Sequence, residues 1–287
     1  MKKQSPIGII GGSGLYSMAD FRLKKKIALK TPFGKPSDSF LLGELEGKQV
    51  VFLPRHGIGH RYTPTEVNYR ANIWGMKKLG VEAVFSVSAV GSLKEEIKPG
   101  HMVVIDQFID RTRGRIATFF EKGIVAHVSF ADPVCGNLRR QLIKASTDAG
   151  AVTHEKGTYV CMEGPMFSTK AESHFYRSIG ADVIGMTNLT EAKLAREAEI
   201  CYATLALSTD YDCWHQGIEP VTADEVIAVL KQNVVMAQKI LKKVVHRFNA
   251  PAECACRHAL CHAIVTDRKK IPASTKQRLK LVAGKYL

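Results

Sequence analysis

Residues 201–214 read CYATLALSTDYDCW, an apolar run that ends in two carboxylates one residue apart. The run is short, partly β-branched and aromatic, and it follows a helical pattern at residues 191–199, which is typical of a buried parallel strand in an α/β sheet. Polar groups just past the carboxyl end of such a strand lie where open α/β sheets bind ligands. Because alternate residues of an extended segment point the same way, Asp210 and Asp212 are predicted to face one ligand together. The alternative is a solvated Asp-rich turn.

Other strand ends carry groups that suit phosphate. Residues 7–14 (IGIIGGSG) predict an apolar strand and a glycine-rich turn that brings Ser13 and backbone N–H groups close to an anion. Residues 50–57 (VVFLPRHG) end in Arg55 and His56, and arginine offers planar paired donors to phosphate. Residues 83–92 (AVFSVSAVGS) end in small and hydroxylated residues that include Ser88 and Ala89. Considered one at a time, each of these strand ends is equally well explained as an ordinary tight turn or an exposed basic loop.

Periodicity and turn signals predict one α/β domain with a mixed sheet flanked by helices, in which a hairpin at residues 40–53 turns at Glu46 and Gly47. The length of 287 residues also allows two smaller domains, but no linker is visible. We expect a catalytic domain over residues 1–250 and a helical, Cys-containing extension over residues 251–287. Helices are predicted at residues 64–79 with Thr63 as N-cap, 137–149, 169–179, 191–199 and 222–245, and further strands at 102–109, 157–162 and 183–187.

Composition excludes several classes of protein. A hydrophobic content of 45% with 24% charged residues is ordinary for a globular enzyme, and no apolar run approaches a membrane span. The N-terminus, MKKQSP, has no cleavable apolar region, so we expect a cytoplasmic protein. The formal charge of +14 invites a nucleic-acid-binding alternative. The basic residues gather at 24–26, 239–247 and 268–285 without aromatic interleaving, which favours solvated basic faces and no nucleic-acid partner.

The seven cysteines are scattered along the chain and show no zinc-ligand spacing, so the sequence predicts no metal site. Cys161 and Cys201 lie in apolar runs and are interpreted as core residues. Cys254 and Cys256 lie in the tail, where they can form a strained disulfide, join Cys261, or join a core cysteine. Free thiols are the expectation for a cytosolic chain.

Eight segments together resemble the purine nucleoside phosphorylases of the trimeric type, and among them the 5′-methylthioadenosine phosphorylases. They are residues 11–14 (GGSG), 31–37 (TPFGKPS), 55–57 (RHG), 68–74 (NYRANIW), 91–93 (GSL), 106–111 (DQFIDR), 163–165 (EGP) with 167–168 (FS), and 209–214 (TDYDCW). The likeness extends from residue 7 to about residue 241. A Cys-x-Cys tail of this kind forms disulfides in archaeal relatives.

The resemblance implies that inorganic phosphate attacks the anomeric carbon of methylthioadenosine and releases adenine and 5-methylthioribose 1-phosphate. Phosphate is a co-substrate, and neither a metal nor an organic cofactor is implied. Met186 would lie under the ribose, Asp210 would act as the catalytic acid facing purine N7, and Asp212 would accept from the exocyclic amine. The residues implied for phosphate are Ser13, Arg55, His56, Ser88, Ala89 through its backbone, and Thr187.

At the 5′ end of the substrate the resemblance implies that Ser168, Ala223 and Val226 set specificity, and apolar Val226 suits a methylthio group. His127 would reach into a neighbouring subunit, which implies a homotrimer or a dimer of trimers. Ala223 is smaller than the usual residue of the family, and the tail after residue 251 matches poorly. The enzymatic alternative is a methylthioinosine or general purine nucleoside phosphorylase, against which Asp212 argues because its carboxylate would repel a 6-oxo group.

Overall fold

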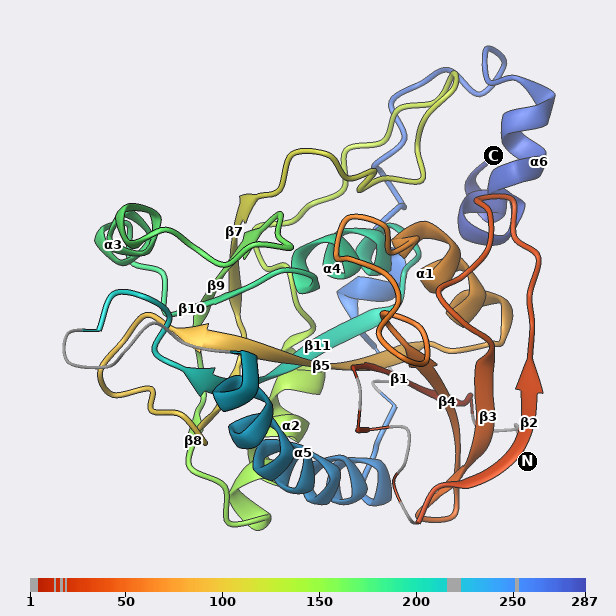
Figure 1. The fold of residues 1–287 in the computed structure, drawn as a ribbon. Coiled ribbons are helices and arrows are strands. Elements are labelled where there is room, and N and C mark those ends of the chain that lie inside the picture. Colours follow the sequence, from red (N-terminus) through yellow and green to blue (C-terminus); the bar gives the residue numbers. More distant parts are fainter. Residues whose placement is uncertain (1–4, 13, 16–17, 19, 216–222, 251–252) are drawn as a thin grey trace.

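The computed structural model describes residues 5–12, 14, 15, 18, 20–215, 223–250 and 253–287, without the side chains of 223–228. It confirms an α/β fold with one mixed sheet flanked by helices, drawn in Figure 1. The strands are β1 Ile7–Gly11, β2 Arg22–Ile27, β3 Phe40–Leu45, β4 Lys48–Pro54, β5 Ala83–Ser92, β6 Met102–Val104, β7 Gln107–Arg111, β8 Thr153–His154, β9 Thr158–Met162, β10 Val183–Gly185 and β11 Cys201–Asp210. The α-helices are α1 Tyr69–Lys78, α2 Gly136–Asp148, α3 Lys170–Ser178, α4 Asn188–Glu197, α5 Ala223–His246 and α6 Ala273–Ala283, with 3₁₀ turns η1 Ala255–His258 and η2 Gly284–Tyr286.

Strand β5 holds the sheet together. It runs parallel to β1 on one side and parallel to β11 on the other, and its last two residues pair antiparallel with β10. The hairpin β3–β4 continues the sheet beyond β1 and turns at Glu46 and Gly47, both with positive φ, as predicted. Because β1, β4, β5 and β11 run in the same direction, their carboxyl ends lie along one margin of the sheet.

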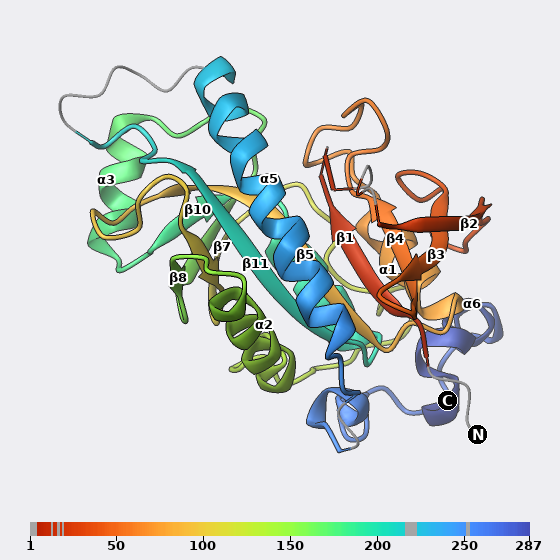
Figure 2. The ribbon, with the colours of Figure 1, turned by 90° about the horizontal axis from the view of Figure 1, so that it is seen from below.

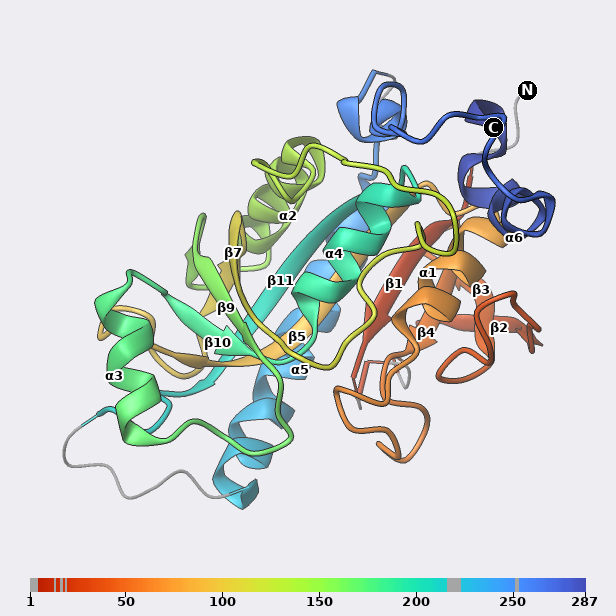
Figure 3. The ribbon, with the colours of Figure 1, turned by 90° about the horizontal axis from the view of Figure 1, so that it is seen from above.

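Both faces of the sheet are covered. Figure 2 shows α2 and α5 across one face, and Figure 3 shows α1 and α4 across the other. The side chains of β11 alternate between these layers: Cys201, Ala203 and Leu205 pack with α2 and α5, whereas Tyr202 packs with α1 and α4. A strand buried on both faces must be apolar throughout, which is why residues 201–207 have no polar alternation.

One sequence-based expectation about an element was wrong, and one strand was not predicted. The helix predicted from residue 64 begins at Tyr69, because Asn68 caps it by accepting from the Ala71 N–H. Thr63 and Glu66 bond reciprocally in the capping-box manner, but they close only a separate turn. Strand β2 was not predicted because it is a lysine-rich edge strand with almost every residue exposed, which removes the apolar alternation.

The C-terminal tail packs on the face of the sheet that α1 and α4 cover. Leu260, Ile264, Ile271 and Leu279 are buried in the same apolar cluster as those two helices. The basic stretch at the end of the tail, for which no separate prediction was made, forms α6. None of the helices in the described part of the chain combines the length and the apolar character that a membrane crossing demands.

Candidate active site

Asp210 is the last residue of β11 and is largely enclosed. The Thr209 hydroxyl lies 2.6 Å from Asp210 Oδ2, and the Asp212 N–H donates to Oδ1 over 2.8 Å. Burial raises the pKa of Asp210 and the nearby charge of Asp212 adds to the rise, while these two hydrogen bonds oppose it. The carboxyl group is therefore closer to a proton donor at neutral pH than an exposed aspartate is.

Asp212 does not continue the strand. The prediction that the two carboxylates share a direction by strand alternation was wrong, because β11 ends at Asp210 and Asp212 has φ +51°. Burial raises the pKa of Asp212, while the neighbouring Ser173 and Ser168 side chains and the local backbone oppose the rise. The turn nevertheless leaves the two acids adjacent, and it places the predicted specificity residue Ser168 beside Asp212.

Gly91 of β5 faces both acids. A Cβ atom there would lie 2.9 Å from Asp210 Oδ1 and 3.3 Å from Asp212 Cβ. The β5–β11 register also shifts between Ser208 and Asp210, which is opposite Gly91. A glycine is thus required at this position to let the acid pair lie close over the central strand.

Thr187 lies between β10 and the amino end of α4. Its hydroxyl oxygen is buried and has no hydrogen-bond partner among the described residues. Its backbone N–H points toward Tyr159 Oη at 3.4 Å, and Tyr159 in turn hydrogen-bonds Ser88. Helix amino ends attract anions through their free N–H groups and the helix dipole. An unpartnered hydroxyl at this point suits a bound anion.

Arg55 is buried and bonded on every side. Its Nε donates to Glu191 Oε1 over 2.5 Å and its Nη2 to Oε2 over 3.1 Å, so the pair is bidentate. Nη1 donates to the Val87 carbonyl and Nη2 also to Ser86 Oγ. Burial alone would lower the pKa of Arg55, but the charge and hydrogen bonds of Glu191 raise it. The paired donors predicted to face phosphate are thus directed at Glu191 in this structure.

His56, next to Arg55, is neutral at pH 7. Burial, with the adjacent Arg55 charge, lowers its pKa to about 4. Its Nδ1 lies 2.9 Å from the Tyr62 carbonyl oxygen, which can only accept, so Nδ1 carries the proton and Nε2 is an acceptor. A neutral imidazole of this tautomer can accept a hydrogen bond from a protonated oxyanion.

Met186 borders the loop after β9. A Cβ atom at Gly164 would lie 2.5 Å from Met186 Sδ, so only glycine permits this approach. Arg115 fixes the arrangement by donating to the Met186 carbonyl and to Glu163, both in its backbone and side chain. Burial would raise the pKa of Glu163, but bonds from Thr65, from the loop backbone and from Arg115 lower it to about 2. Met186 is therefore a rigidly supported apolar surface.

Strand β5 brings these groups to one margin of the sheet. Arg55 contacts its Val87, Tyr159 joins Thr187 to its Ser88, and the acid pair lies against its Gly91. At about 3.3 Å per strand residue, the four steps from Val87 to Gly91 span roughly 13 Å. Ala89, between them, is exposed in a strand whose other residues are buried or half-buried. The margin thus has one end that suits an oxyanion and one acidic end, with an accessible backbone between them.

Other predicted residues are not brought to this margin. Ser13 and the side chains of Ala223 and Val226 lie outside the described residues. His127 is exposed, and it lines a cavity of about 780 Å³ that also borders Cys135, at the opposite end of β11 from Asp210. Within one subunit His127 is therefore remote from the acid pair.

Sequence reasoning missed three side chains that support the site. Glu191 and Tyr159 bond Arg55 and Thr187 from segments distant in the sequence, and Ser173 lies beside Asp212. Glu191 lay in a predicted helix, but only its burial distinguishes it from a surface acid. A buried glutamate needs a cationic partner, but burial is not visible in the sequence, so the sequence offered no signal for this pair.

The family model described as the phosphorylase superfamily matches residues 6–246. A curated S-methyl-5′-thioadenosine phosphorylase of Geobacter sulfurreducens is 59% identical over 98% of this chain and 99% of its own length. The protein of the same name from Hyperthermus butylicus is 52% identical over 91% of this chain and 96% of its own.

Solved structures give the same grouping. A methylthioadenosine phosphorylase from an antarctic soil metagenomic library matches with a TM-score of 0.92 and 52% identity, over 98% of this chain and 99% of the other. The methylthioadenosine phosphorylase of Schistosoma mansoni in complex with adenine matches with a TM-score of 0.83 and 35% identity, over 98% of each chain. The chain therefore belongs to the phosphorylase superfamily, and within it to the S-methyl-5′-thioadenosine phosphorylases.

Proposed function

We propose that the protein catalyses phosphorolysis of S-methyl-5′-thioadenosine by inorganic phosphate, giving adenine and 5-methylthio-α-D-ribose 1-phosphate. The observation that carries the proposal is the pairing, along β5, of an unpartnered Thr187 hydroxyl at a helix amino end with a buried acid of raised pKa, Asp210. One end suits a phosphate and the other a departing purine. Relatives that bear this enzyme name at 48–59% identity support the choice of substrate.

Phosphate would be held at the amino end of α4. Thr187 Oγ1 would donate to one oxygen, Ser88 to a second, and the exposed Ala89 segment would add a backbone N–H. His56 Nε2 would accept from a protonated phosphate oxygen. Arg55, held by Glu191, would keep this end in shape through its bonds to Ser86 and the Val87 carbonyl, and Ser13 would be the sixth contributor.

The base would meet the acid pair. As the phosphate oxygen bonds to the anomeric carbon, the glycosidic C–N bond breaks and its electron pair stays with adenine. Asp210 would stabilise that charge by delivering a proton to N7, and the proton lost by phosphate balances the one gained by the base. Asp212 would accept from the 6-amino group and disfavour a 6-oxo group. Met186 would support the ribose between the two ends.

At the 5′ end, Ser168, Ala223 and Val226 would select the methylthio group, with His127 supplied by a neighbouring subunit of a homotrimer or dimer of trimers. The exposure of His127, far from its own subunit's acid pair, agrees with such a role. The reaction needs no organic cofactor, and the site residues would act without a metal. A cytoplasmic location, the absence of a nucleic-acid partner, and the division into residues 1–250 and 251–287 stay predictions.

The test is phosphate-dependent release of base from two substrates that differ only at position 6. Purified protein should release adenine from methylthioadenosine much faster than hypoxanthine from methylthioinosine. Asp212→Asn should reverse or narrow that preference, because an amide can donate to a 6-oxo group. A wild-type preference for methylthioinosine would favour the alternative function, and base release independent of phosphate would contradict phosphorolysis.

A further inference from the structure

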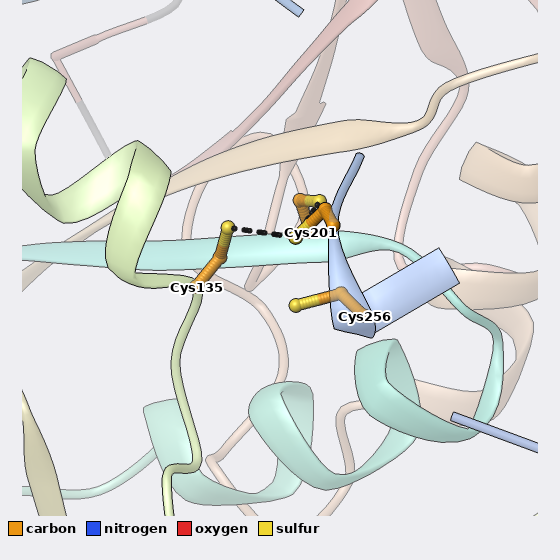
Figure 4. A group of neighbouring side chains, drawn as sticks. Cys135, Cys201 and Cys256 are labelled. Atoms are coloured by element: carbon orange, nitrogen blue, oxygen red, sulfur yellow. Dashed lines mark hydrogen bonds between the residues drawn. The ribbon is translucent and has the colours of Figure 1, made fainter. Parts of the chain in front are cut away.

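Four cysteines from three separate segments converge on one point. Cys135 precedes α2, Cys201 opens β11, and Cys254 and Cys256 flank the start of η1 in the tail; Figure 4 shows the side chains of Cys135, Cys201 and Cys256 turned toward one another. All four sulfur atoms lie within 4.8 Å of one another. We call these residues the cysteine cluster. Spacing along the chain does not reveal the cluster, because Cys135 lies 66 residues from Cys201 and 119 residues from Cys254.

The sulfur geometry is that of a tetrahedral thiolate site. Zinc–sulfur bonds of about 2.3 Å arranged tetrahedrally set neighbouring sulfur atoms about 3.8 Å apart. Cys254 Sγ lies 3.6 Å from Cys135 Sγ and 3.6 Å from Cys201 Sγ. Since Cys254 is equally far from two partners, the contacts single out no pair for a disulfide, whereas a central ion uses all four sulfur atoms.

We propose that the cysteine cluster binds one Zn²⁺ ion and thereby fastens the C-terminal tail to the amino ends of β11 and α2. This revises the expectation, drawn from spacing alone, that the chain has no metal site. The proposal is independent of the proposed function, because Cys201 and Asp210 lie at opposite ends of a strand about 30 Å long. The ion would therefore be structural, with four protein ligands and no open position for a substrate.

The surroundings suit such a site. Cys135, Cys201 and Cys256 are buried at the edge of the apolar cluster under α2 and α5, which shields a thiolate–metal bond from water. The cavity of about 780 Å³ borders Cys135, Cys254 and Cys256 and gives an ion a path inward.

The cluster also favours thiolate formation. Cys135 is the N-cap of α2, where the helix dipole stabilises an anion. A cation held by the four sulfur atoms would favour loss of the thiol protons.

The experiment measures zinc in the full-length protein. Protein is produced with added zinc, kept reduced, passed through gel filtration without chelator, and analysed by elemental mass spectrometry. About one zinc per chain is expected, because a Cys₄ site is retained under these conditions. Cys254→Ser and Cys256→Ser should each lower the zinc content at least about tenfold, whereas Cys261→Ser, an exposed cysteine of the same tail, should leave it unchanged.

A second measurement uses only the wild-type protein, so it does not depend on whether the cysteine variants fold. A mercurial should displace the same single equivalent of zinc from the wild-type protein, measured with a colorimetric chelator. Loss of the zinc should also speed amide hydrogen exchange over residues 253–264 without changing exchange near Asp210. Reduced protein without zinc overturns the proposal. So does a thiol titration of the purified protein that finds only three of the seven cysteines free, since the cluster would then hold two disulfides.

Discussion

Glu191→Gln tests whether the buried pair with Arg55 stabilises the end of the site that we propose binds phosphate. The substitution keeps the shape of the side chain but leaves the Arg55 charge without a counter-charge in a site where both residues are at most 2% exposed. Removing one partner of a buried ion pair costs about 3–5 kcal/mol. With about 2.1 cal/mol/K of unfolding entropy per residue over 287 residues, the melting temperature should fall by about 5–8 °C.

The assay is thermal unfolding followed by circular dichroism in phosphate-free buffer. The control is Glu44→Gln, which breaks the Lys24–Glu44 pair on the surface and should leave the melting temperature unchanged. A Glu191→Gln melting temperature within about 1 °C of wild type would refute the reasoning, because an unpaired buried guanidinium should lower the free energy of unfolding by more than that shift allows.

A double variant separates the unpaired charge from lost packing. Arg55→Met with Glu191→Leu replaces the pair with apolar groups of similar volume, which is often neutral for stability when a buried pair is exchanged. We expect it to melt above Glu191→Gln although it carries two substitutions. If it melts lower, the loss in the single variant comes from packing or from the bonds of Glu191 to Ser86 and Tyr202.

Three further predictions follow from the site. Thr187→Val removes the unpartnered hydroxyl. Because a hydrogen bond to a charged ligand is worth about 1.5–3 kcal/mol, the KM for phosphate should rise about 10- to 150-fold, while Thr187→Ser stays near wild type. Initial rates that show an unchanged KM for phosphate would contradict the assignment. His56 has a pKa of about 4 in the folded chain and an ordinary pKa of 6.5, so the unfolded chain binds more protons between these pH values. The free energy of unfolding should be highest above pH 6.5 and fall by up to about 3 kcal/mol toward pH 4. Urea unfolding should show a smaller fall in His56→Gln. Asp210 must be protonated to act as an acid, so kcat should fall as pH rises through its raised pKa; Asp210→Asn should lower kcat about 10²- to 10⁴-fold and lose this limb, and a variant that keeps the limb would assign it to another group.

The sheet was predictable where burial dictated composition. Residues 201–207 and 83–90 are apolar because both faces of β11 and β5 are covered, so their runs identified them as central strands. The edge strand β2 was not predictable, because it faces solvent and carries lysines that any exposed loop would also carry. The positive φ of Asp212 was equally hidden, since aspartate accepts both extended and left-handed backbone.

The residues of the site were predictable as types but not as pairs. The ends of strands gave Arg55, Ser88 and Asp210 because ligands bind at carboxyl ends of parallel strands. Nothing local pairs Arg55 with Glu191, which lies 136 residues away and is joined to it only by the crossing of α4 over the sheet. The cysteine cluster was missed for the same reason, since three segments meet only after the tail has folded back onto β11.

The Arg55–Glu191 pair resolves a conflict between the two ends of the site. An anion-binding end needs positive charge, but a bare guanidinium at the same sheet margin as Asp210 would favour the ionised acid and so weaken the proton donor. Glu191 cancels that charge at close range, so the pull on an anion is left to short-range groups: the Thr187 hydroxyl, the amino end of α4 and the backbone near Ala89. Burial can then raise the pKa of Asp210 without opposition from the Arg55 charge. Release of the doubly charged sugar phosphate is also easier, because the Arg55 charge is already paired with Glu191.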